Sequence, residues 1–221
     1  MSDSPKRILC YGDSNTWGSV PLSDLRYSDQ VRWPKILQKT LGDSFDVIEQ
    51  GLGGRTIAFD DQEGEMLGLE LNGFKLLERI IVSQLPLEYV IVMLGTNDVK
   101  VKFNASVEMI IANLKLMINT IKQSADYLDH NPQIVVSSIA AIHPQVNLLC
   151  DDFLGREGIV REINSKIKNL AVTEKIHFFD GFAYTQEASA DGLHFTKQSH
   201  IAFGENLSKK ILELEGKKYN M

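Results

Sequence analysis

The sequence contains few cysteines and no long apolar run, whereas many cysteines are typical of disulfide-rich secreted proteins and long apolar runs of membrane proteins. Two cysteines among 221 residues are too few for a disulfide framework. No apolar run approaches the length of a membrane span, and the polar start leads into an apolar run too short for the core of a signal peptide. We therefore expect a soluble cytoplasmic protein that does not enter a membrane.

An excess of basic charge is also absent. Lys and Arg number 23 against 29 Asp and Glu, which gives a formal net charge of −6 and argues against a nucleic-acid partner. The histidines and cysteines lack the close spacing of a zinc site. No phosphate-binding loop or dinucleotide glycine fingerprint follows an apolar run. We expect neither a metal nor a cofactor.

What is present is an alternation of short apolar runs and amphipathic stretches. Each run is predicted to be a buried strand, at residues 8–11, 45–49, 89–94, 134–139 and 176–179. Apolar residues at helical spacing predict helices at 74–81, 107–121 and 159–170, and a last one after Thr196 as its N-cap. The pattern predicts one domain over residues 1–221, a three-layer α/β/α sandwich around a five-stranded parallel sheet. The segments 12–33 and 51–73 are predicted to be long loops near strand ends.

The first polar cluster, Gly12-Asp13-Ser14-Asn15, directly follows the first predicted strand. A serine at a strand-to-helix turn has an exposed hydroxyl, and the nearby helix N-terminus favours developing negative charge. The same serine also fits an ordinary helix N-cap, and Asp13 fits a carboxylate that closes the turn.

The last cluster, Asp191-Gly192-Leu193-His194, precedes the last predicted helix. A carboxylate three residues before a histidine can fix its tautomer, so that the free ring nitrogen acts as a base on a serine. His143, just after the fourth predicted strand, is the reserve candidate for that base. The other three histidines are placed in a strand, a helix and a polar turn.

Two further clusters follow the second and third predicted strands. Gly51-Leu52-Gly53-Gly54-Arg55-Thr56 lets the backbone approach a ligand closely, and Gly95-Thr96-Asn97-Asp98 offers an uncharged amide donor on Asn97. Taken singly, each cluster also fits a plain turn or a helix cap. Since ligands of an open parallel sheet bind beyond the carboxyl ends of its strands, we expect the clusters to form one site.

These four clusters, in this order, resemble the motifs of the SGNH hydrolases, also called the GDSL-like esterase/lipase superfamily. The resemblance extends over nearly the whole chain and departs at Asn15, where the family commonly has leucine. It implies that Ser14 is the nucleophile and that Asp191 and His194 complete a catalytic triad. It also implies an oxyanion hole made by the Ser14 and Gly54 backbone N–H groups and the Asn97 side chain, with Gly53 as the alternative to Gly54.

Within that superfamily, Gly12-Asp13-Ser14-Asn15-Thr16-Trp17-Gly18 looks like the arylesterase/acyltransferase branch. That likeness implies a flavodoxin-like fold, small ester substrates and assembly into homo-oligomers. It places Trp17 beside the nucleophile as a wall of the acyl pocket, although a plain packing role is as good a reading. Asp13 and His143 are further pocket candidates.

The predicted function is hydrolysis of small carboxylic esters through an acyl-enzyme. Acyl transfer, thioester hydrolysis and sugar-acetyl hydrolysis by the same site are alternatives, and a non-catalytic α/β binding module is the alternative from another class. The sequence does not predict the acyl length. Four apolar residues fit either a pocket wall or a subunit contact: Ile142, Val146, Leu148 and Leu149.

Overall fold

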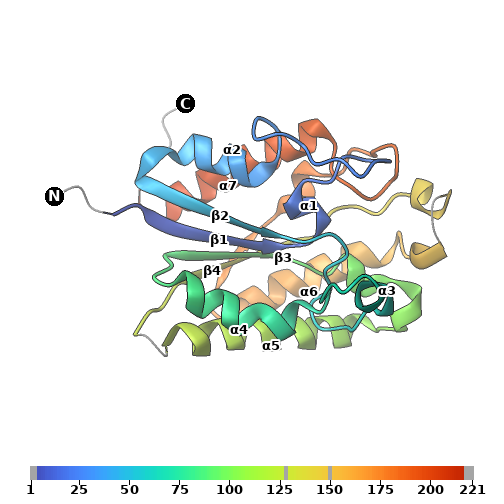
Figure 1. Ribbon diagram of the computed structural model, residues 1–221, viewed down its shortest axis with the longest axis horizontal. Coiled ribbons are helices and arrows are strands. Elements are labelled where there is room, and N and C mark those ends of the chain that lie inside the picture. Colours follow the sequence, from blue (N-terminus) through green and yellow to red (C-terminus); the bar gives the residue numbers. More distant parts are fainter. Residues whose placement is uncertain (1–3, 127–128, 149–150, 217–221) are drawn as a thin grey trace.

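A five-stranded parallel sheet forms the centre of the computed structural model, which describes residues 4–126, 129–148 and 151–216. Its strands lie in the order β2-β1-β3-β4-β5, and every neighbouring pair is parallel (Figure 1). This is the strand order of flavodoxin-like folds. The bounds are β1 Lys6–Gly12, β2 Phe45–Gly51, β3 Tyr89–Met93, β4 Gln133–Ser137 and β5 His177–Phe179.

Helices cover both faces of the sheet (Figure 1). α2 (Trp33–Leu41) and α7 (Lys197–Leu214) pack on one face, and α4 (Gly73–Gln84), α5 (Val107–Asp126) and α6 (Ile159–Thr173) pack on the other. Each layer buries its own hydrophobic cluster against the strands, which is why the strands read as continuous apolar runs. The predicted three-layer α/β/α sandwich is confirmed.

One helix was missing from the prediction. The sequence pattern predicted a loop over 12–33 and no helix between that loop and the strand at 45–49, whereas α2 begins at Trp33. Its buried residues Trp33, Ile36, Leu37 and Leu41 have helical spacing, and Pro34 is tolerated because it lies in the first turn. Two short helices also interrupt the predicted loops, α1 (Ser14–Trp17) and α3 (Gln62–Met66).

Several smaller expectations can be located in the structure. The side chain of Thr196 caps α7 as predicted, since its hydroxyl accepts the Ser199 N–H at 3.1 Å. Cys10 is a buried free thiol, and Cys150 lies outside the described residues. Ile142 and Val146 are buried in the cluster under α5 and α6. The structure does not describe the side chains of Leu148 and Leu149. In the described part of the chain, no helix is long and apolar enough to cross a bilayer.

α1 packs directly on the ends of β1 and β2. A Cβ at Gly51 would lie 2.2 Å from the Trp17 nitrogen, and one at Gly12 would lie 2.0 Å from the Thr16 hydroxyl. Only glycine permits this approach. It holds α1, which begins with Ser14, against the carboxyl edge of the sheet beside the β1–β3 boundary, where flavodoxin-like folds bind their ligands.

Candidate active site

Ser14, His194 and Asp191 form one hydrogen-bonded chain. The Ser14 Oγ lies 3.0 Å from His194 Nε2, and His194 Nδ1 lies 2.7 Å from Asp191 Oδ2. Ser14 and His194 are 180 positions apart in sequence, and the parallel sheet brings them together by placing α1 beside the loop that precedes α7. The predicted contact between imidazole and hydroxyl is confirmed.

Asp191 is arranged to remain ionised. Its Oδ1 accepts the backbone N–H groups of Leu193 and His194, both at 3.0 Å, and the Ser189 hydroxyl at 2.9 Å. Burial disfavours the charged carboxylate, but the hydrogen bonds from the His194 ring and from these N–H groups outweigh it and hold the pKa of Asp191 well below its usual range. An ionised Asp191 favours the tautomer with the proton on Nδ1 and leaves Nε2 as an acceptor toward Ser14.

Asp13 is the N-cap of α1. Its carboxylate accepts the Asn15 N–H at 2.9 Å, and the residue is only 1% exposed. Burial raises the pKa of Asp13 to about 6, against the opposing effects of the Asn15 N–H and the His194 charge. The structure therefore places Asp13 in the turn beneath Ser14, which is the turn-closing role open to it from sequence, and gives its carboxylate almost no surface toward a substrate.

Besides the Ser14 N–H at the start of α1, the predicted oxyanion donors are Gly54, which follows β2, and Asn97, which follows β3. Asn97 directly follows the loop after β3, and its Nδ2 donates to the Arg55 carbonyl at 3.1 Å. That bond uses one amide hydrogen and leaves the second for another acceptor. Gly54, the residue before Arg55, has a left-handed φ of +78° and is half-buried, whereas Gly53 is exposed. Asn97 is thus fastened to the residue that follows Gly54.

Arg55 is a buried arginine that sequence reasoning did not single out. Its guanidinium donates to the Gly12 carbonyl at 2.9 Å and to the Gln50 carbonyl, and it lies 4.3 Å from the centre of the Tyr11 ring. One side chain therefore ties the ends of β1 and β2 to the loop that carries Gly54. The glycines before Arg55 predict a loop, but only the folded structure shows which carbonyl groups Arg55 contacts.

Asp98, which lies in the short helical turn after β3, also fastens the segment after β2. Both carboxylate oxygens accept the Ile57 N–H, at 2.9 and 3.0 Å, and the residue is fully buried. Burial raises the pKa of Asp98 to about 7 despite the Ile57 N–H, and the nearby Asp13 charge adds to the rise. Asp98 thus holds the 51–58 segment against the loop that carries Asn97.

The remaining pocket candidates lie at the edges of the triad. Trp17 ends α1, is half-buried, and has the Arg26 guanidinium 5.4 Å from its ring centre. The His143 N–H donates to the Gly192 carbonyl at 2.8 Å, so the backbone of His143 supports the turn before His194. The Ser14 hydroxyl contacts His194, which makes the reserve role of His143 as the base unnecessary.

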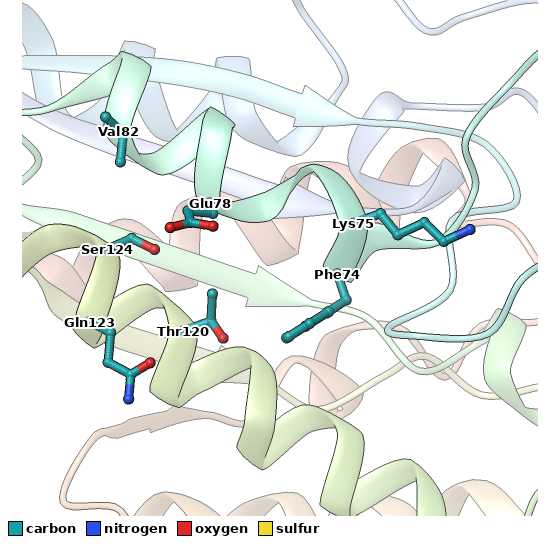
Figure 2. A pocket seen from close by; sticks show the side chains of 7 residues that line it. All are labelled: Phe74, Lys75, Glu78, Val82, Thr120, Gln123 and Ser124. Atoms are coloured by element: carbon teal, nitrogen blue, oxygen red, sulfur yellow. The ribbon is translucent and has the colours of Figure 1, made fainter.

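Away from the triad, the described residues form a groove but no cluster of metal ligands. Within the described residues, no group of three His, Cys, Asp or Glu side chains is placed to hold a metal ion. A groove of about 620 Å³ runs between α4 and α5, and Figure 2 shows the side chains of Phe74, Glu78 and Ser124 among those that line it. None of the predicted site residues lines this groove.

Comparison with known proteins agrees with the geometry. The model of the GDSL-like lipase/acylhydrolase family matches residues 10–201. The M. smegmatis aryl esterase structure is 34% identical with a TM-score of 0.86, covering 95% of this chain and 99% of that one. Est24, a carbohydrate acetylesterase from Sinorhizobium meliloti, is 29% identical with a TM-score of 0.88, over 95% of this chain and 99% of its own. No curated protein sequence matches the chain.

Proposed function

Because this chain belongs to the GDSL-like lipase/acylhydrolase family, we propose that it is a serine esterase that hydrolyses small carboxylic esters through an acyl-enzyme. The observation that carries the proposal is the chain of contacts from Ser14 Oγ through the His194 ring to the Asp191 carboxylate. A histidine oriented in this way can activate a hydroxyl that is too weak a nucleophile on its own.

In the first half of the reaction, His194 Nε2 takes the Ser14 proton as Oγ attacks the ester carbonyl. The Ser14 and Gly54 backbone N–H groups and the Asn97 side chain donate to the resulting oxyanion. The bond from Asn97 to the Arg55 carbonyl supports this role, because it fixes the amide with one hydrogen still free. The C–O bond to the alcohol then breaks, and His194 returns the proton to the leaving alcohol.

In the second half, His194 deprotonates a water molecule that attacks the acyl-Ser14 carbonyl. The same donors stabilise the second oxyanion, and collapse of that intermediate restores the Ser14 hydroxyl and releases the acid. Asp191 remains ionised throughout, which stabilises the imidazolium that forms twice in each turnover.

The substrate class rests on the relatives. An aryl esterase and a carbohydrate acetylesterase share the fold over almost their whole length, and both names describe cleavage of an ester bond. We assign Trp17 to the wall of the acyl pocket, because it ends the helix that Ser14 begins, and place His143 at the rim beyond Gly192.

The proposal includes assembly of several copies of the chain in the cytoplasm. Large apolar side chains are exposed on the two long segments beside the site, including Leu25 at 67%, Met66 at 87% and Leu67 at 75%. Apolar surface of this kind is common at contacts between subunits. A light-scattering mass equal to that of one chain would contradict the assembly.

The test of the function is the replacement Ser14→Ala. We expect hydrolysis of p-nitrophenyl acetate to fall by about 10⁴-fold or more, because removal of the nucleophile leaves only binding and the oxyanion donors. Ser124→Ala is the matched control, since Ser124 is a buried serine on α5 outside the site, and it should keep wild-type activity. An active Ser14→Ala protein would refute the proposal. An ester series with longer acyl groups, acetylated sugars and thioesters then defines the substrate.

A further inference from the structure

Asn15 stands where the family motif commonly has leucine, and its side chain is joined to the backbone on both sides of His194. We propose that Asn15 is a positioning residue that holds the His194 turn at the distance from Ser14 needed for proton transfer. The inference rests on the proposed function, because it assumes that Ser14 and His194 exchange a proton.

The side chain of Asn15 bonds to backbone groups of the two residues that flank His194. Its Oδ1 accepts the Phe195 N–H at 2.8 Å, and its Nδ2 donates to the Leu193 carbonyl at 3.4 Å. The two partners flank His194 on either side. Asn15 is also the residue next to Ser14 and is only 2% exposed, so this amide joins the nucleophile helix directly to the turn that carries the base.

The turn has other tethers, among them the Leu22 N–H on Asp191 Oδ2 and the His143 N–H on the Gly192 carbonyl, and none of these joins it to α1. Asp191 accepts the N–H groups of Leu193 and His194, which closes the turn on itself and orients the ring. Phe195 anchors the far end, because its side chain is buried in the cluster under α7. Of these tethers, only the amide of Asn15 links the turn to the helix that begins with Ser14.

A leucine at position 15 has no group to replace these bonds. The Phe195 N–H would lose its acceptor in a buried place, and the turn would relax to find another. The Oγ–Nε2 distance of 3.0 Å lies within hydrogen-bonding range, and a shift of the turn away from α1 would lengthen it. A misplacement of about 1 Å in a reacting group can cost about 10²-fold in rate.

The experiment compares Asn15→Leu with Asn164→Leu. Asn164 is a matched control on α6, because its Oδ1 accepts the Ile139 N–H at 2.8 Å and its Nδ2 donates to the Ile139 carbonyl at 3.0 Å. For Asn15→Leu we expect kcat for p-nitrophenyl acetate to fall by about 10²-fold with KM within about threefold, and labelling of Ser14 by a fluorophosphonate to slow in parallel. Asn164→Leu should lower the thermal midpoint while kcat stays within about threefold, measured where both proteins are folded.

A wild-type kcat in folded Asn15→Leu would overturn the inference, and so would equal losses of kcat in the two leucine variants. If Asn15→Leu does not fold, Asn15→Ala with Asn164→Ala as its control replaces the pair, because alanine removes both amide bonds without adding bulk. A fall of kcat by about tenfold or more in Asn15→Ala alone supports the inference, and unchanged kcat overturns it. Ser14→Ala measured alongside separates the two claims, since an active Ser14→Ala protein removes the proposed function itself.

Discussion

At the scale of single residues, the site shows how surroundings decide what a carboxylate does. Asp191 receives three hydrogen bonds on one oxygen and the imidazole on the other, and its pKa lies well below the usual range. Asp98 is buried deeper, and burial raises its pKa to about 7. The first carboxylate is suited to stabilising an imidazolium, and the second to fastening a loop.

The role of Asn97 is tested by Asn97→Ala. In the proposed mechanism the variant loses a side-chain donor to the oxyanion, and we expect kcat to fall by about 10²–10³-fold with a smaller change in KM. Steady-state kinetics with p-nitrophenyl acetate measure both constants. Asn206→Ala is the control, since the Asn206 side chain bonds within its own helix, where it donates to the Ala202 carbonyl and accepts from Lys209 Nζ. A loss below about fivefold in Asn97→Ala would remove Asn97 from the oxyanion hole.

At the scale of elements, the strands and four of the helices follow from the sequence because a buried parallel sheet demands long apolar runs and amphipathic crossovers. The predicted strand at residues 45–49 corresponds to Phe45–Gly51, and the predicted helix at 107–121 to Val107–Asp126. α2 was missed although Trp33, Ile36 and Leu41 are spaced as a helix requires, because the segment before it reads as a loop.

The contact between Ser14 and His194 could also be predicted, since each follows a local pattern and the carboxyl ends of parallel strands share one edge. The side chains that hold the site in place could not be predicted. Arg55 and Asn15 bond to backbone groups, and any residue supplies a carbonyl or an N–H. Sequence therefore carries no sign of the partner of such a side chain, and only the fold identifies it.

The packing of α1 on β2 is tested by Gly51→Ala. Its Cβ would meet the Trp17 nitrogen at 2.2 Å and the Thr16 carbonyl carbon at 2.6 Å, both backbone atoms that cannot swing away. We expect a loss of about 2–3 kcal/mol or more in the free energy of unfolding by urea, together with lower activity as α1 shifts. Gly53→Ala is the control for stability, because a Cβ there meets nothing within 4 Å. Equal stability of the two variants would show that this contact is not tight.

For the molecule as a whole, the carboxyl edge of the sheet contains buried carboxyl groups that support the site and lower the stability of the fold. The two helical layers bury large hydrophobic clusters, whereas the loops between them hold the buried carboxyl groups of Asp13 and Asp98. Charged carboxylates in such places destabilise the fold, and burial raises their pKa values to about 6 and about 7. In return, Asp13 caps the helix that begins with Ser14, and Asp98 fastens the segment that follows Gly54.

Because burial disfavours the charged form of Asp98, the free energy of unfolding should depend on pH, and Asp98→Asn should remove that dependence. The folded pKa of Asp98 is about 7, above its ordinary value of 3.8, so its contribution to stability is fully present below about pH 4 and is lost as pH rises to 7. Asparagine does not ionise. The unfolding free energy of the variant minus that of wild type should therefore rise by about 2–4 kcal/mol from pH 4.5 to pH 8. Urea unfolding at both pH values measures the difference, and an unchanged difference would contradict the burial of an ionisable Asp98.

In the proposed mechanism His194 activates the Ser14 hydroxyl, and covalent labelling of Ser14 is the sharpest test of that activation. In a reaction with a fluorophosphonate, Ser14 Oγ bonds to phosphorus, fluoride leaves, and His194 takes the proton. Mass spectrometry of wild type should show a single adduct on the peptide that contains Ser14, with labelling slowed by about 10³-fold or more in His194→Ala. An unlabelled Ser14, or equally fast labelling without the imidazole, would contradict the account.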